Sequence, residues 1–327
     1  MNLELNDRAP ARFAGGAAVD NQHAGAGDIN HARPDISANR RRAKAMKFLR
    51  RCRSYLLPSA PRIGAIQLAT GAALVIAPFS GATWHWYLVA LFGYFMHGCI
   101  GHSIGYHRYF AHRSFTAPKW AEVLFTFCGA LGCVGPPLAW SFMHRRHHAR
   151  PDQNGDPYTA HLYPRPHWRA LFLGDYRPGY SEKRLRRVLR NQPLQRVVHR
   201  YYFGIVGGYA LALLAIDWYL FLFGWAVPVA LTLWISALDA YAAHHWGYRN
   251  YQTRDASRNL WWMALLFWGE GWHNNHHARP GDWNFRQRWW EFDIGAMVIT
   301  AMGLRPFAAD KKPATIHESR REGIGEA

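Results

Sequence analysis

The chain has 327 residues, of which 50% are hydrophobic, and a formal net charge of +18 from 39 Lys and Arg against 21 Asp and Glu. Its basic residues flank long apolar runs, which is typical of a membrane protein and argues against a compact nucleic-acid-binding module. The four cysteines form no CxxC pair, so the sequence indicates neither a zinc knuckle nor a disulfide framework.

Residues 1–60 are rich in Ala, Gly, Asn, Asp and Arg without helical or strand periodicity, which predicts a disordered, basic N-terminal tail. They contain no apolar signal core, so we expect no cleaved secretion signal. Eight basic residues lie between Arg40 and Arg53. Such a segment beside a membrane span favours anchoring on anionic cytoplasmic lipid over binding to nucleic acid.

Apolar runs predict the membrane spans, because a helix that crosses a bilayer needs about 20 apolar residues. Four runs are interpreted as spans, at about residues 63–79, 83–104, 201–216 and 218–240. Pro228 is expected to kink the last span without ending it, since membrane helices tolerate proline. Three shorter runs are expected at the interface or against the bundle, namely residues 123–134, 260–268 and 294–303.

The predicted fold is all-α, an integral membrane bundle of four transmembrane helices. The domain is expected to cover residues 61–308 and to be followed by a C-terminal tail at 309–327. Seven further basic residues between Lys183 and Arg200 precede the third span. Together with the basic stretch before the first span, they place both of those helix ends in the cytoplasm. An even number of spans then makes both termini cytoplasmic.

Three histidine clusters lie near the ends of the apolar runs: HRYFAH (His107, His112), HRRHH (His144, His147, His148) and HNNHH (His273, His276, His277). Four spans would put all three clusters on the cytoplasmic side. Residues at i, i+3 and i+4 share one helix face, so each HxxHH box is expected to converge on a common point. His107 and His112 diverge by about 140° on an ideal α-helix, so either they reach separate metals or the helix ends between them.

These clusters predict bound metal, because eight neighbouring imidazoles would repel one another if protonated. Two metals suit that number, and His244, beside His245, is a ninth candidate. A zinc hydrolase would show HExxH, and a soluble di-iron bundle would show paired ExxH helices, whereas this chain has only Glu270 to His273. Two irons held mainly by histidine remain. Isolated histidines are interpreted as interfacial or core residues: His85, His97, His102, His161, His167 and His199.

The order HRYFAH, HRRHH and GEGWHNNHH resembles the membrane fatty acid desaturase family, specifically the bacterial acyl-CoA delta-9 (stearoyl-CoA-like) branch. Further matches are Trp140 four residues before His144, the pair Asp156-Pro157, the run AHHWGYR and the run RWWEFD. The resemblance covers about residues 65–305. It implies a cytosolic helical cap that carries a histidine-rich di-iron site.

The resemblance also implies nine iron ligands: His107, His112, His144, His147, His148, His244, His273, His276 and His277. His244 rather than His245 is chosen because the family pattern HxxG is completed by Gly247. The residues expected to support these ligands are Asp239, Glu270, Asn274, Asp156 and Trp140. The family has asparagine where this chain has Ala240, so either Asp239 takes its place or water fills the gap.

The activity implied is oxygen-dependent desaturation of a fatty acyl thioester, in which two hydrogens leave adjacent methylenes, a cis double bond forms and water is produced. Dioxygen is the co-substrate. Zinc can replace iron in recombinant material. Because no GxGxxG fingerprint or fused cytochrome is visible, the electrons are expected from a ferredoxin or cytochrome b5-like carrier with its reductase. The expected location is the bacterial cytoplasmic membrane, in contact with its lipid, with the metal site on the cytoplasmic side.

Two alternatives stay open on the residues. A fatty acyl or lipid hydroxylase would use the same di-iron scaffold and differ in giving an alcohol. A metal transporter or sensor would need polar residues along the spans, where this sequence has Asp217 at a turn and Asp239 at an end. Nucleic acid is not an expected partner. Acyl chain length, head group, double-bond position and oligomeric state do not follow from the sequence.

Overall fold

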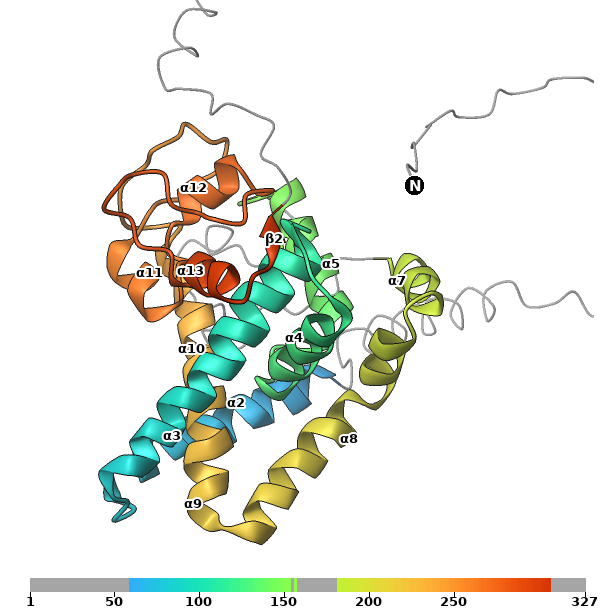
Figure 1. Ribbon diagram of the computed structural model, residues 1–327, viewed down its shortest axis with the longest axis vertical. Helices are drawn as coiled ribbons and strands as arrows, with labels where there is room; N and C mark the ends of the chain where they lie inside the picture. The colour runs from blue at the N-terminus through green and yellow to red at the C-terminus, as the bar shows by residue number, and fades with distance from the viewer. Residues whose placement is uncertain (1–58, 154–155, 158–180, 307–327) are drawn as a thin grey trace, which may run out of the picture. The chain divides into compact units, whose positions relative to one another are not determined.

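The computed structural model describes residues 59–153, 156–157 and 181–306, all of them in one compact unit, Arg53–Ala327. These residues are mostly helical (Figure 1). Three predicted segments lie outside the described residues: the C-terminal tail, the basic stretch from Arg40 to Arg53, and the N-terminal tail apart from Ser59 and Ala60.

The first helices form a hairpin. α2 (Ser59–Ile76) runs directly into the 3-10 turn η1 (Ala77–Phe79). The chain reverses at Gly81, whose φ of +74° is the left-handed conformation that glycine adopts without strain. α3 (Trp84–Tyr94) then continues without a break into the π-helical segment η2 (Phe95–Ala111).

A second hairpin follows later in the chain. α7 (Glu182–Arg190) leads into α8 (Pro193–Ile216), and Asp217 begins α9 (Trp218–Phe221) by accepting a hydrogen bond from the backbone N–H of Leu220. A π-helical turn, η3 (Leu222–Ala226), then joins α9 to α10 (Val227–Ala242). The helix therefore passes through Pro228 without ending there, as predicted.

Among the described residues, three helices are long and apolar enough to cross a membrane, Trp84–Ala111, Pro193–Ile216 and Trp218–Ala242. Two of these helices extend beyond the spans predicted there: Trp84–Ala111 continues past residue 104, and Pro193–Ile216 begins before residue 201. Helical hydrogen bonding continues beyond the apolar runs because polar residues such as His107 and Arg108 are buried against other helices. The predicted first span corresponds to a shorter apolar helix, Gly64–Phe79.

Shorter helices form the end of the molecule at which η2 finishes. They are α4 (Lys119–Leu131), α5 (Pro137–Ala149), α11 (Trp261–Leu266), α12 (His273–Ala278) and α13 (Ile294–Ala301). Three of them, α4, α11 and α13, overlap the runs predicted to be too short to cross. A two-residue antiparallel ribbon pairs β1 (Phe115–Thr116) with β2 (Arg305–Pro306), which the all-α prediction did not include.

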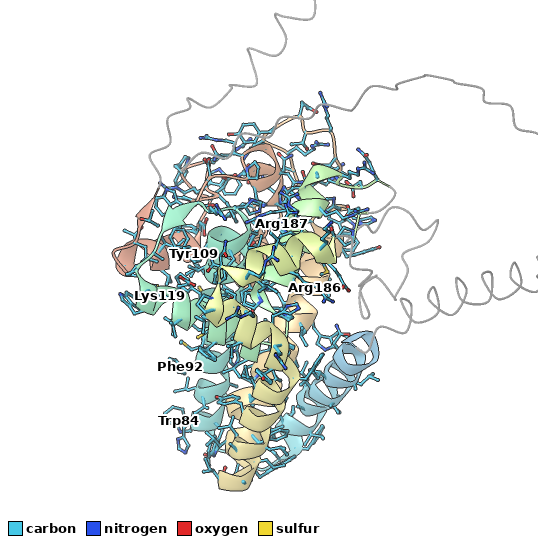
Figure 2. The ribbon with its side chains drawn as sticks, turned by 90° about the vertical axis from the view of Figure 1, so that its right-hand side faces the viewer. Trp84, Phe92, Tyr109, Lys119, Arg186 and Arg187 are labelled. Carbon is cyan, nitrogen blue, oxygen red and sulfur yellow. The ribbon has the colours of Figure 1, made fainter. Side chains whose placement is uncertain are left out.

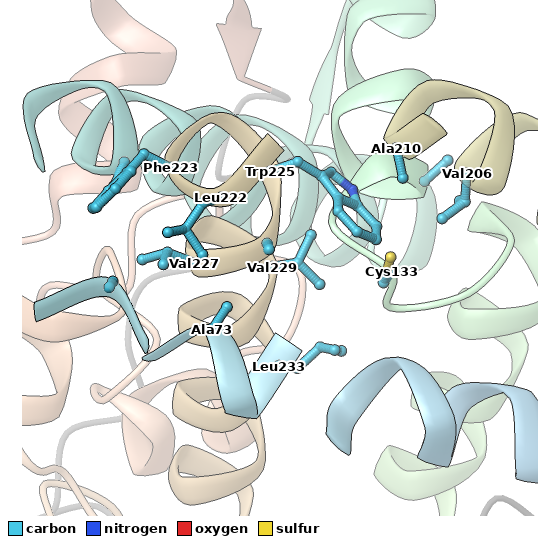
Figure 3. Close-up of a cluster of buried hydrophobic side chains, with 14 of the residues drawn as sticks. Ala73, Cys133, Val206, Ala210, Leu222, Phe223, Trp225, Val227, Val229 and Leu233 are labelled. Carbon is cyan, nitrogen blue, oxygen red and sulfur yellow. The ribbon is translucent and has the colours of Figure 1, made fainter. Parts of the chain in front are cut away.

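The two largest apolar clusters of the described residues hold most of these elements together. One joins α2, α3, α8 and α10 through residues such as Phe223, Trp225 and Val229 (Figure 3). The other packs η2 against α4 and α13, where Gly101 lets the backbones meet, since a Cβ there would lie 2.3 Å from the Gly129 nitrogen. Trp84 and Phe92 lie exposed along α3, away from the end where Tyr109 and the α7 arginines Arg186 and Arg187 are found (Figure 2).

Candidate metal centre

Nine histidines from four parts of the chain gather in two groups. In each group one ring nitrogen of every member lies within 4.8 Å of the others. The five-histidine group consists of His107, His112, His144, His148 and His276. The four-histidine group consists of His147, His244, His273 and His277. These are the nine residues that the family resemblance implies as ligands.

The Nε2 atoms face inward in both groups. In the five-histidine group, Nε2 of His276 lies 2.8 Å from that of His107 and 2.9 Å from that of His148. Nε2 of His144 lies 2.9 Å from those of His112 and His148. The four-histidine group is similar, with Nε2 separations of 3.0 Å between His244 and His273 and 3.2 Å between His147 and His277.

This spacing fits a metal ion. A metal–imidazole bond of about 2.0–2.1 Å places neighbouring ligand nitrogens about 2.9–3.4 Å apart in octahedral or tetrahedral geometry. When the Nδ1 atom of an imidazole donates to a carboxylate, its Nε2 atom carries a lone pair. The Nε2 lone pairs within a group point toward one another and repel, and a bound cation removes this repulsion. The donor set and its spacing therefore fit two ions, one per group.

His107 and His112 reach the same group because η2 is π-helical. The backbone N–H of His112 donates to the carbonyl of His107, five residues earlier, at 3.1 Å. An i→i+5 helix brings residues five apart nearly into line, whereas an α-helix would separate them by about 140°. Of the two predicted alternatives, the helix does end between the two histidines, at Ala111, and both join one group instead of separate ones.

Each HxxHH box serves both groups, so the predicted common point was wrong. In α5, His144 and His148 join the five-histidine group and His147 the other. In α12, His273 and His277 join the four-histidine group, and His276 crosses to the five-histidine group. Residues at i and i+4 differ by about 40° around a helix, whereas the residue at i+3 lies to one side of both. In α5 and in α12, the helix face that carries the three histidines of the box therefore lies between the two groups.

His244 follows α10 and turns its ring inward, with Nε2 beside His273. His245 turns the other way, and its Nδ1 lies 2.8 Å from the carbonyl of Tyr241, on whose ring it stacks. The structure thus brings His244, and not His245, into a group, in line with the prediction from the HxxG pattern.

Carboxylates hold the outer nitrogens of the four-histidine group. Nδ1 of His147 lies 2.9 Å from Asp156, a predicted supporting residue, and Nδ1 of His273 lies 4.0 Å from Asp239, another one. Asp239 therefore lies on the Nδ1 side of His273. Two further aspartates were not predicted: Asp152, 3.0 Å from Nδ1 of His244, and Asp255, 3.0 Å from Nδ1 of His277.

Glu270, another predicted supporting residue, lies beside the five-histidine group. Its carboxylate contacts Nδ1 of His107 and accepts a hydrogen bond from Ser103. Arg108, fully buried, lies 3.5 Å from Glu270 and 3.0 Å from Asp293. Ser103, Arg108 and Asp293 were not predicted, and no spacing in the sequence relates them, since the last two are 185 residues apart.

The two remaining supporting residues act differently from each other. Trp140 stacks on His144, with ring centroids 4.9 Å apart and an interplanar angle of 7°, which fixes that imidazole. Asn274 contacts the chain near Tyr251 instead, accepting from the backbone N–H of Asn250 and Tyr251 at 2.9 and 2.8 Å. It orients α12 as a whole.

Of the isolated histidines, two lie in η2 outside both groups. Nδ1 of His97 is 3.1 Å from the carbonyl of Cys128, and His102 packs between Trp140 and Phe267. His161 and His167 lie outside the described residues.

In six of the grouped histidines burial lowers the pKa and so favours the neutral form, which is the form that binds metal. It lowers the pKa of His277 to about 4, against the opposing effect of the hydrogen bond that Nδ1 of His277 donates to Asp255. Burial, reinforced by neighbouring imidazoles, also holds the pKa values of five further histidines of the two groups well below the ordinary range. These are His112, His144, His148, His273 and His276.

Comparison with known proteins agrees with this geometry. The family model described as "Fatty acid desaturase" matches residues 82–294, well over half of the chain. The chain belongs to the fatty acid desaturase family. The region matched contains every member of the two histidine groups, so the family resemblance seen in the motifs is confirmed. The protein is thus an oxidoreductase of lipid metabolism.

Three curated relatives illustrate the likeness. The chain is 33% identical to "Delta-9 acyl-lipid desaturase 1" of Arabidopsis thaliana, over 76% of this chain and 81% of that protein. It is 32% identical to "sn-1 stearoyl-lipid 9-desaturase" of Anabaena variabilis, over 76% of this chain and 91% of that protein. It is 35% identical to "sn-2 palmitoyl-lipid 9-desaturase" of Nostoc sp. (strain 36), over 68% and 81%. These names specify lipid-linked chains, whereas the motifs had suggested the acyl-CoA branch.

Proposed function

We propose that this desaturase introduces a cis double bond at the delta-9 position of a fatty acyl chain, using dioxygen and two irons held by the nine histidines. The observation that carries the proposal is the pair of buried histidine groups with inward Nε2 atoms. The names of the relatives, which specify delta-9 or 9-desaturation, support the position of the double bond.

The residues of this chain prepare the site. His107, His147, His244 and His277 each have a carboxylate at Nδ1, which holds the proton there and leaves the Nε2 lone pair for a metal. Trp140 keeps the ring of His144 in place. Irons, when bound, supply the oxygen-activating chemistry that removes hydrogen from an unactivated C–H bond.

For the carrier of the acyl chain we propose a membrane lipid, because the printed names of the relatives specify acyl-lipid substrates. Acyl-CoA, which the motifs suggested, is the second candidate. We further propose an acidic external electron carrier, either a ferredoxin or a cytochrome b5-like protein. Helix α7 supports this proposal, because it exposes five basic residues: Lys183, Arg184, Arg186, Arg187 and Arg190. Its buried leucines pack beside Ala139 of α5, the helix that carries HRRHH, so the basic surface lies close to the histidine groups.

We also propose a fourth crossing by α2 and η1, with the histidine groups on the cytoplasmic side of a bacterial membrane. These two elements together contain 21 residues, or about 30 Å, the thickness of the hydrocarbon core. The turns of the two hairpins lie side by side, because Tyr219 donates a hydrogen bond to the carbonyl of Ser80 at 2.9 Å. Four crossings are consistent with both turns on one side and α7 on the other.

The test is expression in a bacterial host that lacks delta-9 unsaturation, followed by mass spectrometry of its lipids. The wild type should give a cis-9 alkene, and His148→Ala should give none. An alcohol in place of the alkene would establish the hydroxylase, and no product with abundant folded protein and a matched carrier would refute the proposal. Purified enzyme offered labelled phospholipid or labelled acyl-CoA identifies the carrier, since direct conversion of acyl-CoA alone would overturn the lipid assignment.

A further inference from the structure

Helices α4 and α5 form an apolar hairpin that starts and finishes at the end of the molecule where η2 ends. Each arm has 13 residues, which is about 20 Å of helix. From Val123 to Met143 the chain has no charged side chain. Lys119 and Glu122, which pair at 3.1 Å, lie at the start of the first arm, and HRRHH lies at the end of the second. Each arm is therefore too short to cross a bilayer but apolar enough to enter one.

The tip of this hairpin, residues 132–136, lies among the long helices. The indole Nε1 of Trp225 in η3 donates a hydrogen bond to the carbonyl of Leu131 at 3.1 Å. Cys133 belongs to the same apolar cluster as Trp225 and Val206 of α8 (Figure 3). The tip is thus packed against two of the helices that are long and apolar enough to cross a membrane.

The rise of these helices gives the depth of the tip. Asp217, charged and exposed in the turn between α8 and α9, marks the end that meets water. At 1.5 Å per residue, Trp225 lies about 12 Å from Asp217 along one helix, and Val206 about 16 Å along the other. Because the hydrocarbon core is about 30 Å thick, the tip lies near its middle. The length of α4 then brings Lys119 back to the opposite surface.

Side chains of the surrounding helices satisfy the backbone of the tip. The N–H of Gly135 donates to the hydroxyl of Tyr202 in α8 at 2.9 Å, and its carbonyl accepts from the hydroxyl of Tyr106 in η2 at 2.9 Å. Pro136 and Pro137 follow, and proline has no N–H to satisfy. Irregular backbone at membrane depth is tolerated where protein supplies such partners. These tyrosines take the place that water has at a surface turn.

The outer face of α4 is apolar. Trp120, Val123 and Phe127 are 56%, 37% and 36% exposed, and their spacing of i, i+3 and i+7 puts them on one face. We call these three residues the α4 stripe. The opposite face is buried against η2 through Phe125 and Gly129. A helix exposed to water carries polar residues on its outer face, so the α4 stripe fits a hydrocarbon neighbour instead.

We infer that α4 and α5 form a re-entrant hairpin. It enters the membrane from the side of the histidine groups, turns at residues 132–136 near the middle of the bilayer, and returns with HRRHH at its end. The α4 stripe contacts the acyl tails of membrane lipid. This inference rests on the proposed crossings of the membrane by the long helices. It anchors the second histidine motif within the bilayer, because α5 begins at the protein-lined tip.

The experiment uses the full chain in lipid nanodiscs, with Cys52→Ser and a nitroxide label at one introduced cysteine, since the other three cysteines are buried. Labels at Phe127→Cys and Val123→Cys should collide with dissolved oxygen and lose collisions with an aqueous nickel complex. The lipid control is Leu211→Cys on the exposed face of α8, and the water control is Arg186→Cys on α7. Power saturation of the electron paramagnetic resonance spectra measures both collision rates.

Each other result counts against a definite claim. Collisions like those of Arg186→Cys at both hairpin positions, with Leu211→Cys in lipid, would overturn the inference and leave the proposed crossings intact. Labels screened from both reagents would show that a second copy of the chain covers the α4 stripe, and would overturn the lipid assignment. A label at Leu211→Cys that meets water would overturn the crossings themselves. If Phe127→Cys fails to fold, as judged by gel filtration and circular dichroism, Val123→Cys decides.

Discussion

At the scale of single residues, the direction of each histidine ring determines which nitrogen is available to a metal. A carboxylate at Nδ1 fixes the proton on that atom, and the lone pair of Nε2 then points into the group. Asp255 shows how this is done. Burial raises its pKa, but hydrogen bonds from His277, Ser257 and Thr253 outweigh that effect and keep the pKa well below its ordinary value. It therefore stays a charged acceptor.

Neighbouring histidines provide a direct test at this scale. His244→Ala should reduce desaturation to background and remove metal, because Nε2 of His244 belongs to the four-histidine group. His245→Ala is the matched control and should retain most activity, since its ring contacts Tyr241 instead. Lipid profiles and metal content of the two variants check this. Equal losses in both would show that the inward ring has been assigned wrongly.

At the scale of elements, the contact between η2 and α4 positions the first histidine motif. The π-helical hydrogen-bond pattern turns His107 and His112 to one side, and close packing at Gly101 and Gly129 holds that helix against its neighbour. A wider helical turn is rare because it is less stable in isolation, so tertiary packing must maintain it.

Substitution of Gly101 tests this contact. In Gly101→Ala the new Cβ would meet the backbone of α4, and we expect a loss of about 1–3 kcal/mol in unfolding free energy. Gly207→Ala is the matched control within a membrane helix, because a Cβ there meets nothing within 4 Å. Thermal unfolding in detergent compares the two. A Gly101→Ala protein as stable as the control would contradict the role of this contact.

At the scale of the whole molecule, the two hairpin turns lie together and the histidine groups lie near the other ends of the same helices. Cysteine labelling tests this topology in a chain whose Cys52 is replaced by serine. A membrane-impermeant maleimide should label Thr83→Cys in intact cells and Arg190→Cys only after permeabilisation, since both side chains are exposed. Labelling of both positions from the same side would rule out the proposed four crossings.

Dependence on pH is a second property of the assembled molecule. Burial lowers the pKa of His277 to about 4 in the folded chain, against an ordinary value of about 6.5 in the unfolded chain. Between these values the unfolded chain binds the extra proton and the folded chain does not, so the stability of the metal-free protein should fall as pH drops from about 6.5 to 4. The unfolding temperature of metal-free protein between pH 7.5 and 4.5 measures this. A constant or rising value toward pH 4.5 would contradict it.

Apolar runs and flanking charges were enough to predict a helical membrane protein, and the order of the histidine motifs, through its resemblance to a known family, implied the desaturase family and nine candidate ligands. These features are local, because hydrophobicity determines where a chain crosses lipid and helical spacing determines which side chains share a face. The extended ends of η2 and α8 were missed because polar residues there are buried by neighbouring helices, which an apolar run does not reveal.

Only the tertiary structure decided how the histidines divide into two groups and which carboxylates stand behind them. Asp152 approaches His244 across 92 residues, and Glu270 approaches His107 across 163. Such pairs depend on how helices pack, and the division of each HxxHH box depends on where its partners lie around the helix. Sequence spacing constrains a single helix, whereas a metal site of this kind is assembled from four separate parts of the chain.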